Sequence, residues 1–318
     1  MPVPSTPAPV PAQPTEGKKP LSNLAQRVIF GVIGAAALLG SVWYGPWTFA
    51  LFFAAVQAKM LLEFYRMMRA GGYQPAKWIG LTVSLMLFAS FSFMAFYKAP
   101  PKDFDTQDTM LFSVGGAVLL LLVVLPIALV LREMVLWPKY KSPFGNIGAT
   151  LTGLLYVSIP MSLLCVISCT SYSEVTGKVM PGLVFYDYRR IFALLFLVWC
   201  SDIGAYAAGK TFGRHKLAPS ISPGKTWEGA IGGFLLTLVM GWALGYLLPE
   251  LSLTYRLVAA GVVAVFGPLG DLAESMLKRS VGVKDSGSIM PGHGGLLDRF
   301  DAFLFILPVL ALLQVLLG

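Results

Sequence analysis

The sequence predicts an all-α, polytopic integral membrane protein, a bundle of about nine transmembrane helices. Apolar residues make up 56% of the 318 residues and charged residues only 13%, and the mean hydropathy is +0.71. Soluble domains usually carry about 25% charged residues. The apolar residues form continuous runs of about 18 or more, long enough to cross a bilayer as helices. These runs lack the alternation of transmembrane strands, which excludes a β-barrel.

Nine apolar runs define the expected helices in order along the chain. They cover residues 28–44, 47–64, 78–97, 110–131, 149–169, 190–208, 227–248, 255–273 and 300–317. The second run is the weakest, because Gln57 and Lys59 interrupt it. Residues 1–20 contain seven prolines and almost no bulky apolar side chain, so we expect a disordered cytoplasmic tail there. The three cysteines fall within expected helices, and no disulfide is predicted.

Lysine and arginine alternate between the loops and so predict the orientation. Five segments on one side of the bundle hold 17 of the 24 basic residues, and the opposite loops hold six. This asymmetry is the positive-inside pattern. It predicts a cytoplasmic N-terminus, an external C-terminus, and loops 209–226 and 274–299 on the cytoplasmic face. The same placement explains the net charge of +8 without a nucleic-acid partner. The short chain without a targeting segment suggests a bacterial inner (cell) membrane.

Polar chemistry concentrates in the second half of the chain, where half of the 16 acids follow residue 201. Asp202 lies inside an apolar run, and an acid at membrane depth is by default a functional candidate. It could instead be a carboxylate near the interface that pairs with Lys210. The next loop combines glycines with basic residues and ends at the start of a helix, which suits phosphate. Its basic residues include Lys225, and Thr226 immediately precedes the helix. A P-loop is excluded, because Pro219 stands where its first glycine belongs.

The densest group of candidate residues follows the eighth run. If that helix continues to residue 279, one of its faces carries two carboxylates, a hydroxyl and an ammonium, from Asp271, Glu274, Ser275 and Lys278. Asp298 and Asp301 form a second acid pair at the start of the ninth helix. Two facing carboxylate pairs could hold Mg²⁺ together with substrate phosphates. A structural explanation exists for some of them: Asp298 and Asp301 could cap the ninth helix, and Lys278 could mark the cytoplasmic side. Capping does not explain the face that carries Asp271.

The stretch from Ser275 to Asp301, SMLKRSVGVKDSGSIMPGHGGLLDRFD, resembles the signature of the phosphatidate cytidylyltransferases, or CDP-diacylglycerol synthases. The preceding DLAES (271–275) and the upstream SPGKTWEG (222–229) resemble that family as well. Met290 departs from the pattern, where Leu, Ile or Phe is expected. The detailed resemblance covers about 100 residues, 202–301, whereas residues 1–190 carry none that is specific.

The resemblance implies transfer of the cytidylyl group of CTP to phosphatidic acid, with Mg²⁺ as cofactor and pyrophosphate as the second product. Asp271 and Asp298 would be the first metal ligands, with Glu274 and Asp301 supporting them. The groups implied to bind phosphate or shape the triphosphate pocket are Ser275, Lys278, Arg279, Ser222, Lys225, Thr226, Lys284, His293, Gly294, Gly295 and Arg299. Residues 191–318 would then be the catalytic region and residues 21–190 its helical support.

The family tends to form dimers, and Gly241-x3-Gly245 could bring two helices close, either within one chain or between two. A CTP-dependent kinase of the polyprenol type is the nearest alternative function, and it would release CDP. A synthase acting on another lipid phosphate would use the same chemistry. An anion or phosphate transporter belongs to a different class. It is disfavoured because no internal repeat is apparent and the charge gathers on one face.

Overall fold

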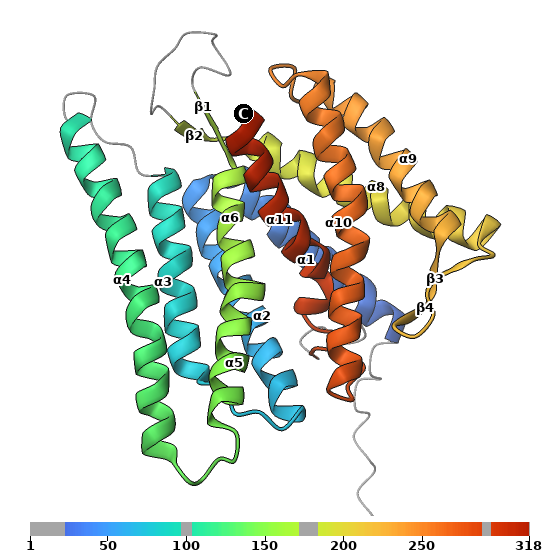
Figure 1. Cartoon of the computed structure of the whole chain (residues 1–318). Coiled ribbons are helices and arrows are strands. Elements are labelled where there is room, and N and C mark those ends of the chain that lie inside the picture. Colours follow the sequence, from blue (N-terminus) through green and yellow to red (C-terminus); the bar gives the residue numbers. More distant parts are fainter. Residues whose placement is uncertain (1–22, 97–103, 172–183, 288–293, 318) are drawn as a thin grey trace, which may run out of the picture.

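The computed structural model describes residues 23–96, 104–171, 184–287 and 294–317, which form a bundle of long helices (Figure 1). The first half contains α1 (Asn23–Tyr44), α2 (Pro46–Ala70), α3 (Lys77–Phe96), α4 (Phe104–Leu136), α5 (Pro143–Gly153) and α6 (Ile159–Ile167). The second half contains α8 (Tyr188–Phe212), α9 (Trp227–Ala243), α10 (Leu253–Ser280) and α11 (Leu297–Leu317). The proline-rich segment 1–20 lies outside the described residues.

Two short antiparallel hairpins interrupt the helices, and the sequence did not predict them. β1 (Cys169–Ser171) pairs with β2 (Val184–Tyr186), and β3 (Lys216–Ala218) pairs with β4 (Ser222–Thr226). Each lies in a polar loop beyond the end of a helix, where strands of three to five residues leave almost no periodic signal. The all-α fold class is otherwise confirmed.

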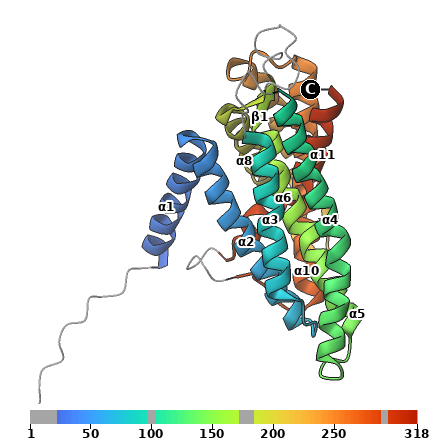
Figure 2. The ribbon, with the colours of Figure 1, turned by 90° about the vertical axis from the view of Figure 1, so that its left-hand side faces the viewer.

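Within the described residues, eight helices are long and apolar enough to cross a membrane. They coincide with the second to ninth predicted runs, and α5 and α6 join through a π-helical turn into one span, Pro143–Ile167. The helix that matches the first run, α1, has a shorter apolar part, Ile29–Tyr44. It packs on α2 and α8 and stands apart from the other helices in Figure 2. The protein is therefore an integral membrane protein.

The weak second run is a buried helix because its polar residue has partners. Gln57 is 0% exposed, and its Nε2 donates to the carbonyl and the hydroxyl oxygens of Ser84, at 3.0 and 2.8 Å. Ser158 donates to the same hydroxyl at 2.8 Å. A satisfied polar group inside a membrane bundle avoids the cost of an unpaired one.

Glycines set the closest helix contacts. A Cβ on Gly204 of α8 would lie 2.8 Å from the carbonyl oxygen of Gly232 on α9, so these two helices touch backbone to backbone. Gly241 faces Ala260 of α10 in the same way, with 2.6 Å between the added Cβ and the alanine Cβ. Gly245 meets the Arg256 side chain, also on α10. The Gly241-x3-Gly245 motif therefore packs within the chain.

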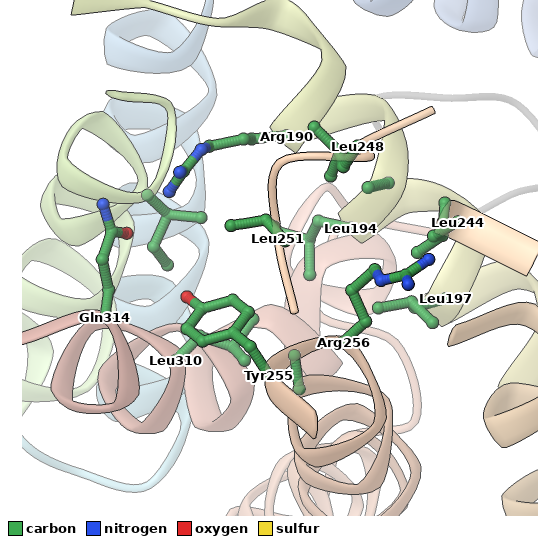
Figure 3. Close-up of a pocket in the computed structure, with 13 residues that line it drawn as sticks. Arg190, Leu194, Leu197, Leu244, Leu248, Leu251, Tyr255, Arg256, Leu310 and Gln314 are labelled. Atoms are coloured by element: carbon green, nitrogen blue, oxygen red, sulfur yellow. The ribbon is translucent and has the colours of Figure 1, made fainter. Parts of the chain in front are cut away.

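The C-terminal end of α2 lies beside the C-terminal end of α10 at one end of the bundle (Figure 1). The end of α8, the β3–β4 hairpin and the start of α9 pack together farther along α10. The β1–β2 hairpin and the chain's C-terminus lie at the opposite end (Figure 1). At that opposite end a leucine-rich cleft of about 60 Å³ has Arg190 and Gln314 on one side and Arg256 on the other (Figure 3). None of the predicted site residues lines it.

Candidate active site

A cavity of about 370 Å³ opens between the end of α8, the β3–β4 hairpin, the start of α9 and α10. Its polar lining comes from Asp202, Lys210, Lys225, Thr226 and Asp271, and Tyr206, Leu217 and Pro268 add apolar walls. Asp202 is exposed and lines this cavity together with Lys210, the partner named for it in its structural interpretation. The cavity thus combines charged groups with apolar surface at the end of the membrane helices.

Lys225 and Asp271 meet at this cavity, although 46 residues separate them in the sequence. The Lys225 ammonium donates to Asp271 Oδ2 at 2.9 Å and to the Pro268 carbonyl oxygen at 3.1 Å. Both side chains remain about one-third exposed. The pair therefore combines two of the predicted site residues and leaves them accessible to a ligand.

The hairpin is fixed in place by the start of α9. Thr226 is the N-cap of α9, and its hydroxyl accepts from the Gly229 amide at 3.2 Å. Glu228, in the first turn, accepts from the amides of Arg214 and His215 and lies 2.6 Å from His215 Nδ1. The sequence analysis did not assign a role to Glu228, although an acid in the first turn of a helix is a recognisable signal.

The predicted continuation of the eighth helix is confirmed, because α10 extends to Ser280. Lys278 lies between Glu274 on its own helix and Asp298 on α11, and its Nζ donates to Asp298 Oδ1 at 2.9 Å. The Glu274 side chain is only 1% exposed. The two acid-bearing helices therefore face each other across an ammonium group.

Close packing of α10 on α11 brings the other acids together. A Cβ on Gly270 would lie 2.6 Å from the Asp301 carbonyl oxygen, so only glycine permits this approach. The backbone of Asp301 therefore lies against the residue that precedes Asp271. The two acid-bearing segments are thus in contact, and the role of their carboxylates as a metal site stays a prediction.

Asp298 also organises the loop before α11. Its carboxylate accepts from the Gly295 amide at 2.7 Å and from the Ser286 amide at 3.2 Å. Gly294 has φ +80°, which favours glycine, and a Cβ there would lie 2.6 Å from Asp298 Oδ2. The glycines are therefore required by backbone conformation and close approach to a carboxylate.

Other predicted residues lie at the edge of this group. Ser275 is half-buried on the same helix as Asp271, and Arg279, Lys284 and Arg299 are exposed near the end of α10 and the start of α11. Ser222 lies at the start of β4, paired with Ala218. His293 falls outside the described residues.

The sequence analysis missed two residues of α2. Glu63 is 1% exposed and accepts from the Leu297 amide at 2.9 Å, and Arg66 donates to the Ser286 carbonyl oxygen. The signal was an acid at the end of an apolar run, which is costly at membrane depth. It was passed over because no motif accompanied it.

The donor set suits Mg²⁺ in its chemistry, because every predicted ligand is a carboxylate. Glu274 Oε1 is buried and has no hydrogen-bond partner among the described residues, so a cation beside it would be favoured. In the described residues, no three acid, histidine or cysteine side chains form a metal cluster. Lys225 and Lys278 instead neutralise the acids.

The fold and the site define a polytopic membrane protein with lysine–carboxylate pairs and a cavity at one end of its helices. The chain belongs to the cytidylyltransferase family, whose sequence profile matches residues 25–317.

Relatives of this chain from several bacteria carry the name phosphatidate cytidylyltransferase. That of Bacillus subtilis (strain 168) is 34% identical over 297 residues, which cover 92% of this chain and 98% of that protein. That of Staphylococcus aureus (strain COL) is 47% identical over 138 residues, 41% of this chain and 53% of that protein. That of Staphylococcus haemolyticus (strain JCSC1435) is 48% identical over 120 residues, 37% of this chain and 46% of that protein.

Proposed function

We propose that this protein is a phosphatidate cytidylyltransferase, which converts CTP and phosphatidic acid into CDP-diacylglycerol and pyrophosphate for phospholipid synthesis. The observation that carries the proposal is a lysine–carboxylate pair, Lys225–Asp271, at a cavity between membrane helices, with a second pair, Lys278–Asp298, between α10 and α11, in a chain of the cytidylyltransferase family. Relatives that bear this enzyme's name support it, one of them over 92% of the chain.

The reaction forms one bond and breaks one. An oxygen of the lipid phosphate bonds to the α-phosphorus of CTP, and the bond from that phosphorus to the bridging oxygen of the β-phosphate breaks. The leaving electron pair goes to pyrophosphate. The nucleophile is already ionised, so the site needs no strong base, and its main tasks are positioning and neutralising charge.

The lysines are the groups that can neutralise the phosphates. Lys225 faces the cavity, whose apolar walls suit the lipid, and Lys278 lies between α10 and α11. When bound, Mg²⁺ would add charge neutralisation at the phosphates. Asp271, Glu274 and Asp301 would hold it with Asp298, whose carboxylate also fixes the loop.

We also propose that the site faces the cytoplasm of a bacterial cell, at its inner membrane. The loops that carry the site, 209–226 and 274–299, are among the five basic segments, and positive charge marks the cytoplasmic side. CTP would reach the site from the cytoplasm, and phosphatidic acid would enter sideways from the bilayer.

The test is a turnover assay on the purified protein in detergent, with phosphatidic acid, CTP labelled at the α-phosphate, and Mg²⁺. Label in the lipid, equimolar pyrophosphate, and loss of both on adding EDTA are expected. Label remaining in soluble CDP would replace the proposal with a lipid kinase. Phosphate flux into liposomes without CTP consumption would replace it with a transporter.

The site residues are tested by Asp298→Asn, which keeps the size of the side chain and removes its charge. Turnover is expected to fall by roughly 10²-fold or more, because Lys278 and the loop amides lose their anionic partner. An inserted, folded variant with normal turnover would contradict the assignment.

A further inference from the structure

An acid from the first half of the chain reaches the loop that precedes α11. Glu63 Oε2 accepts from the Leu297 amide at 2.9 Å and lies 3.5 Å from the Ser286 hydroxyl. These partners are more than 220 residues away in the sequence and lie on either side of the loop. One buried carboxylate therefore holds both ends of the loop together.

Arg66, one turn further along α2, holds the same loop by another atom. Its Nη2 donates to the Ser286 carbonyl oxygen. Ser286 thus donates its hydroxyl to Glu63 and its amide to Asp298, and its carbonyl oxygen accepts from Arg66. Every polar group of this 0% exposed serine is engaged, so its position is determined from both sides.

Two glycines make room for the Glu63 carboxylate. A Cβ on Gly287 would lie 2.4 Å from Glu63 Oε1, and a Cβ on Gly295 would lie 2.5 Å from Glu63 Oε2. Both distances are far below van der Waals contact, so side chains at these positions would expel the acid or displace the loop. The glycines of the signature stretch are matched to an acid on another helix.

The contacts of Glu63 lead directly to the catalytic groups. Its partner Ser286 and its close neighbour Gly295 also donate their amides to Asp298, and Asp298 binds Lys278. Displacing the loop ends would therefore shift the acceptor that orients the ammonium.

We propose that Glu63 and Arg66 are positioning residues for the active site, through which α2 fixes the loop that orients Asp298 and Lys278. The inference rests on the proposed function for its kinetic test. A buried acid held only for stability would be expensive at this depth, where an apolar side chain would pack at lower cost. A positioning role explains why a carboxylate stands there, with Lys59 3.6 Å away to offset its charge.

The first experiment compares Glu63→Gln with Glu133→Gln. Glu133 is a matched control: it is also buried in the first half, but it pairs with Arg132 and Asn146 away from the loop. Glu63→Gln should lower kcat about 10–100-fold, the usual cost of losing a supporting hydrogen-bond partner, and should change KM for either substrate less. Glu133→Gln should keep kcat within about twofold once normalised to folded protein. Equal losses of kcat, or none for Glu63→Gln, would overturn the proposal.

A second experiment tests the fit between acid and glycine. Gly287→Ala alone should be severely impaired, because the two atoms nearest to its added Cβ, at 2.4 and 2.7 Å, both belong to the Glu63 carboxylate. Adding Glu63→Asp, which withdraws the carboxylate by one methylene, should restore part of the activity. If the loss of activity in the double variant equals the product of the losses in the two single variants, the two positions act independently. That result would overturn the proposed fit between acid and glycine.

Amide hydrogen exchange separates this inference from the proposed function. Exchange at Leu297, Gly295 and Ser286 should accelerate in Glu63→Gln and stay unchanged in Glu133→Gln, whether or not the sample turns over CTP. If the wild-type protein forms no product but the exchange differs in this way, the proposed function is wrong, and the inference that Glu63 positions the ends of the loop is supported. Unchanged exchange in Glu63→Gln would refute that inference.

Discussion

Lys278→Met tests the electrostatics of the site most directly, because it keeps the length of the side chain and removes its charge. The Lys278 ammonium lies between Glu274 and Asp298. The exposed fraction is 15% for the Lys278 side chain, 1% for Glu274 and 13% for Asp298. Removing one member of a buried pair costs about 3–5 kcal/mol. Asp298 keeps its backbone amide donors, so most of the cost should fall on Glu274, whose Oε1 has no hydrogen-bond partner among the described residues.

The magnitude is measured from unfolding by SDS in mixed micelles, followed by tryptophan fluorescence. We expect Lys278→Met to lose about 3 kcal/mol or more of unfolding free energy, and the double variant with Glu274→Gln to recover most of that loss. Turnover should fall roughly 10²–10³-fold in both, because the cation that faces the phosphates is missing. A single variant as stable as the wild type, or a double variant that regains turnover, would refute the reasoning.

Two further substitutions test separate parts of the site. Lys225→Met should lower turnover by roughly 10²-fold by removing the partner of Asp271, whereas Lys216→Met on the same hairpin should stay near wild type in the labelled-CTP assay. Gly270→Val should destabilise the protein by about 1–3 kcal/mol, because its Cβ would press on the α11 backbone; Gly261→Val on the same helix has nothing within 4 Å and should unfold like the wild type in SDS. Reversed results within either pair would contradict the corresponding contact.

The helices could be predicted because bilayer thickness dictates their length. Even the interrupted second run is a membrane-spanning helix, because Gln57 forms hydrogen bonds with Ser84 on α3 and Ser162 on α6. The two hairpins could not be predicted, because their strands are short and partly polar. Their geometry depends on caps such as Thr226 and on the acid of Glu228, which act on backbone amides several residues away.

The site was predictable along each helix and unpredictable between helices. The spacing of Asp271, Glu274 and Lys278 places them on one side of α10, and an α-helical period is enough to show this. The pairing of Lys225 with Asp271 depends instead on how α8, α9 and α10 pack, and the approach of Glu63 depends on α2. Such contacts leave no local pattern. Glycines outside turns gave an indication of these contacts between helices, because a glycine often stands where another backbone or side chain approaches closely.

The lysine–carboxylate pairs explain how so apolar a protein can keep a charged site ready. Isolated acids at the end of membrane helices would be costly, and pairing each with an ammonium lowers that cost before any substrate arrives. Lys225 and Lys278 form ion pairs with Asp271 and Asp298 in this structure. In the proposed reaction, the substrate phosphates would take the place of these carboxylates as partners of the two lysines. The exchange replaces one ion pair with another, so little additional charge must be desolvated. In the same proposal, Asp271 and Asp298 would then be available to hold Mg²⁺, so one set of side chains would serve both states of the site.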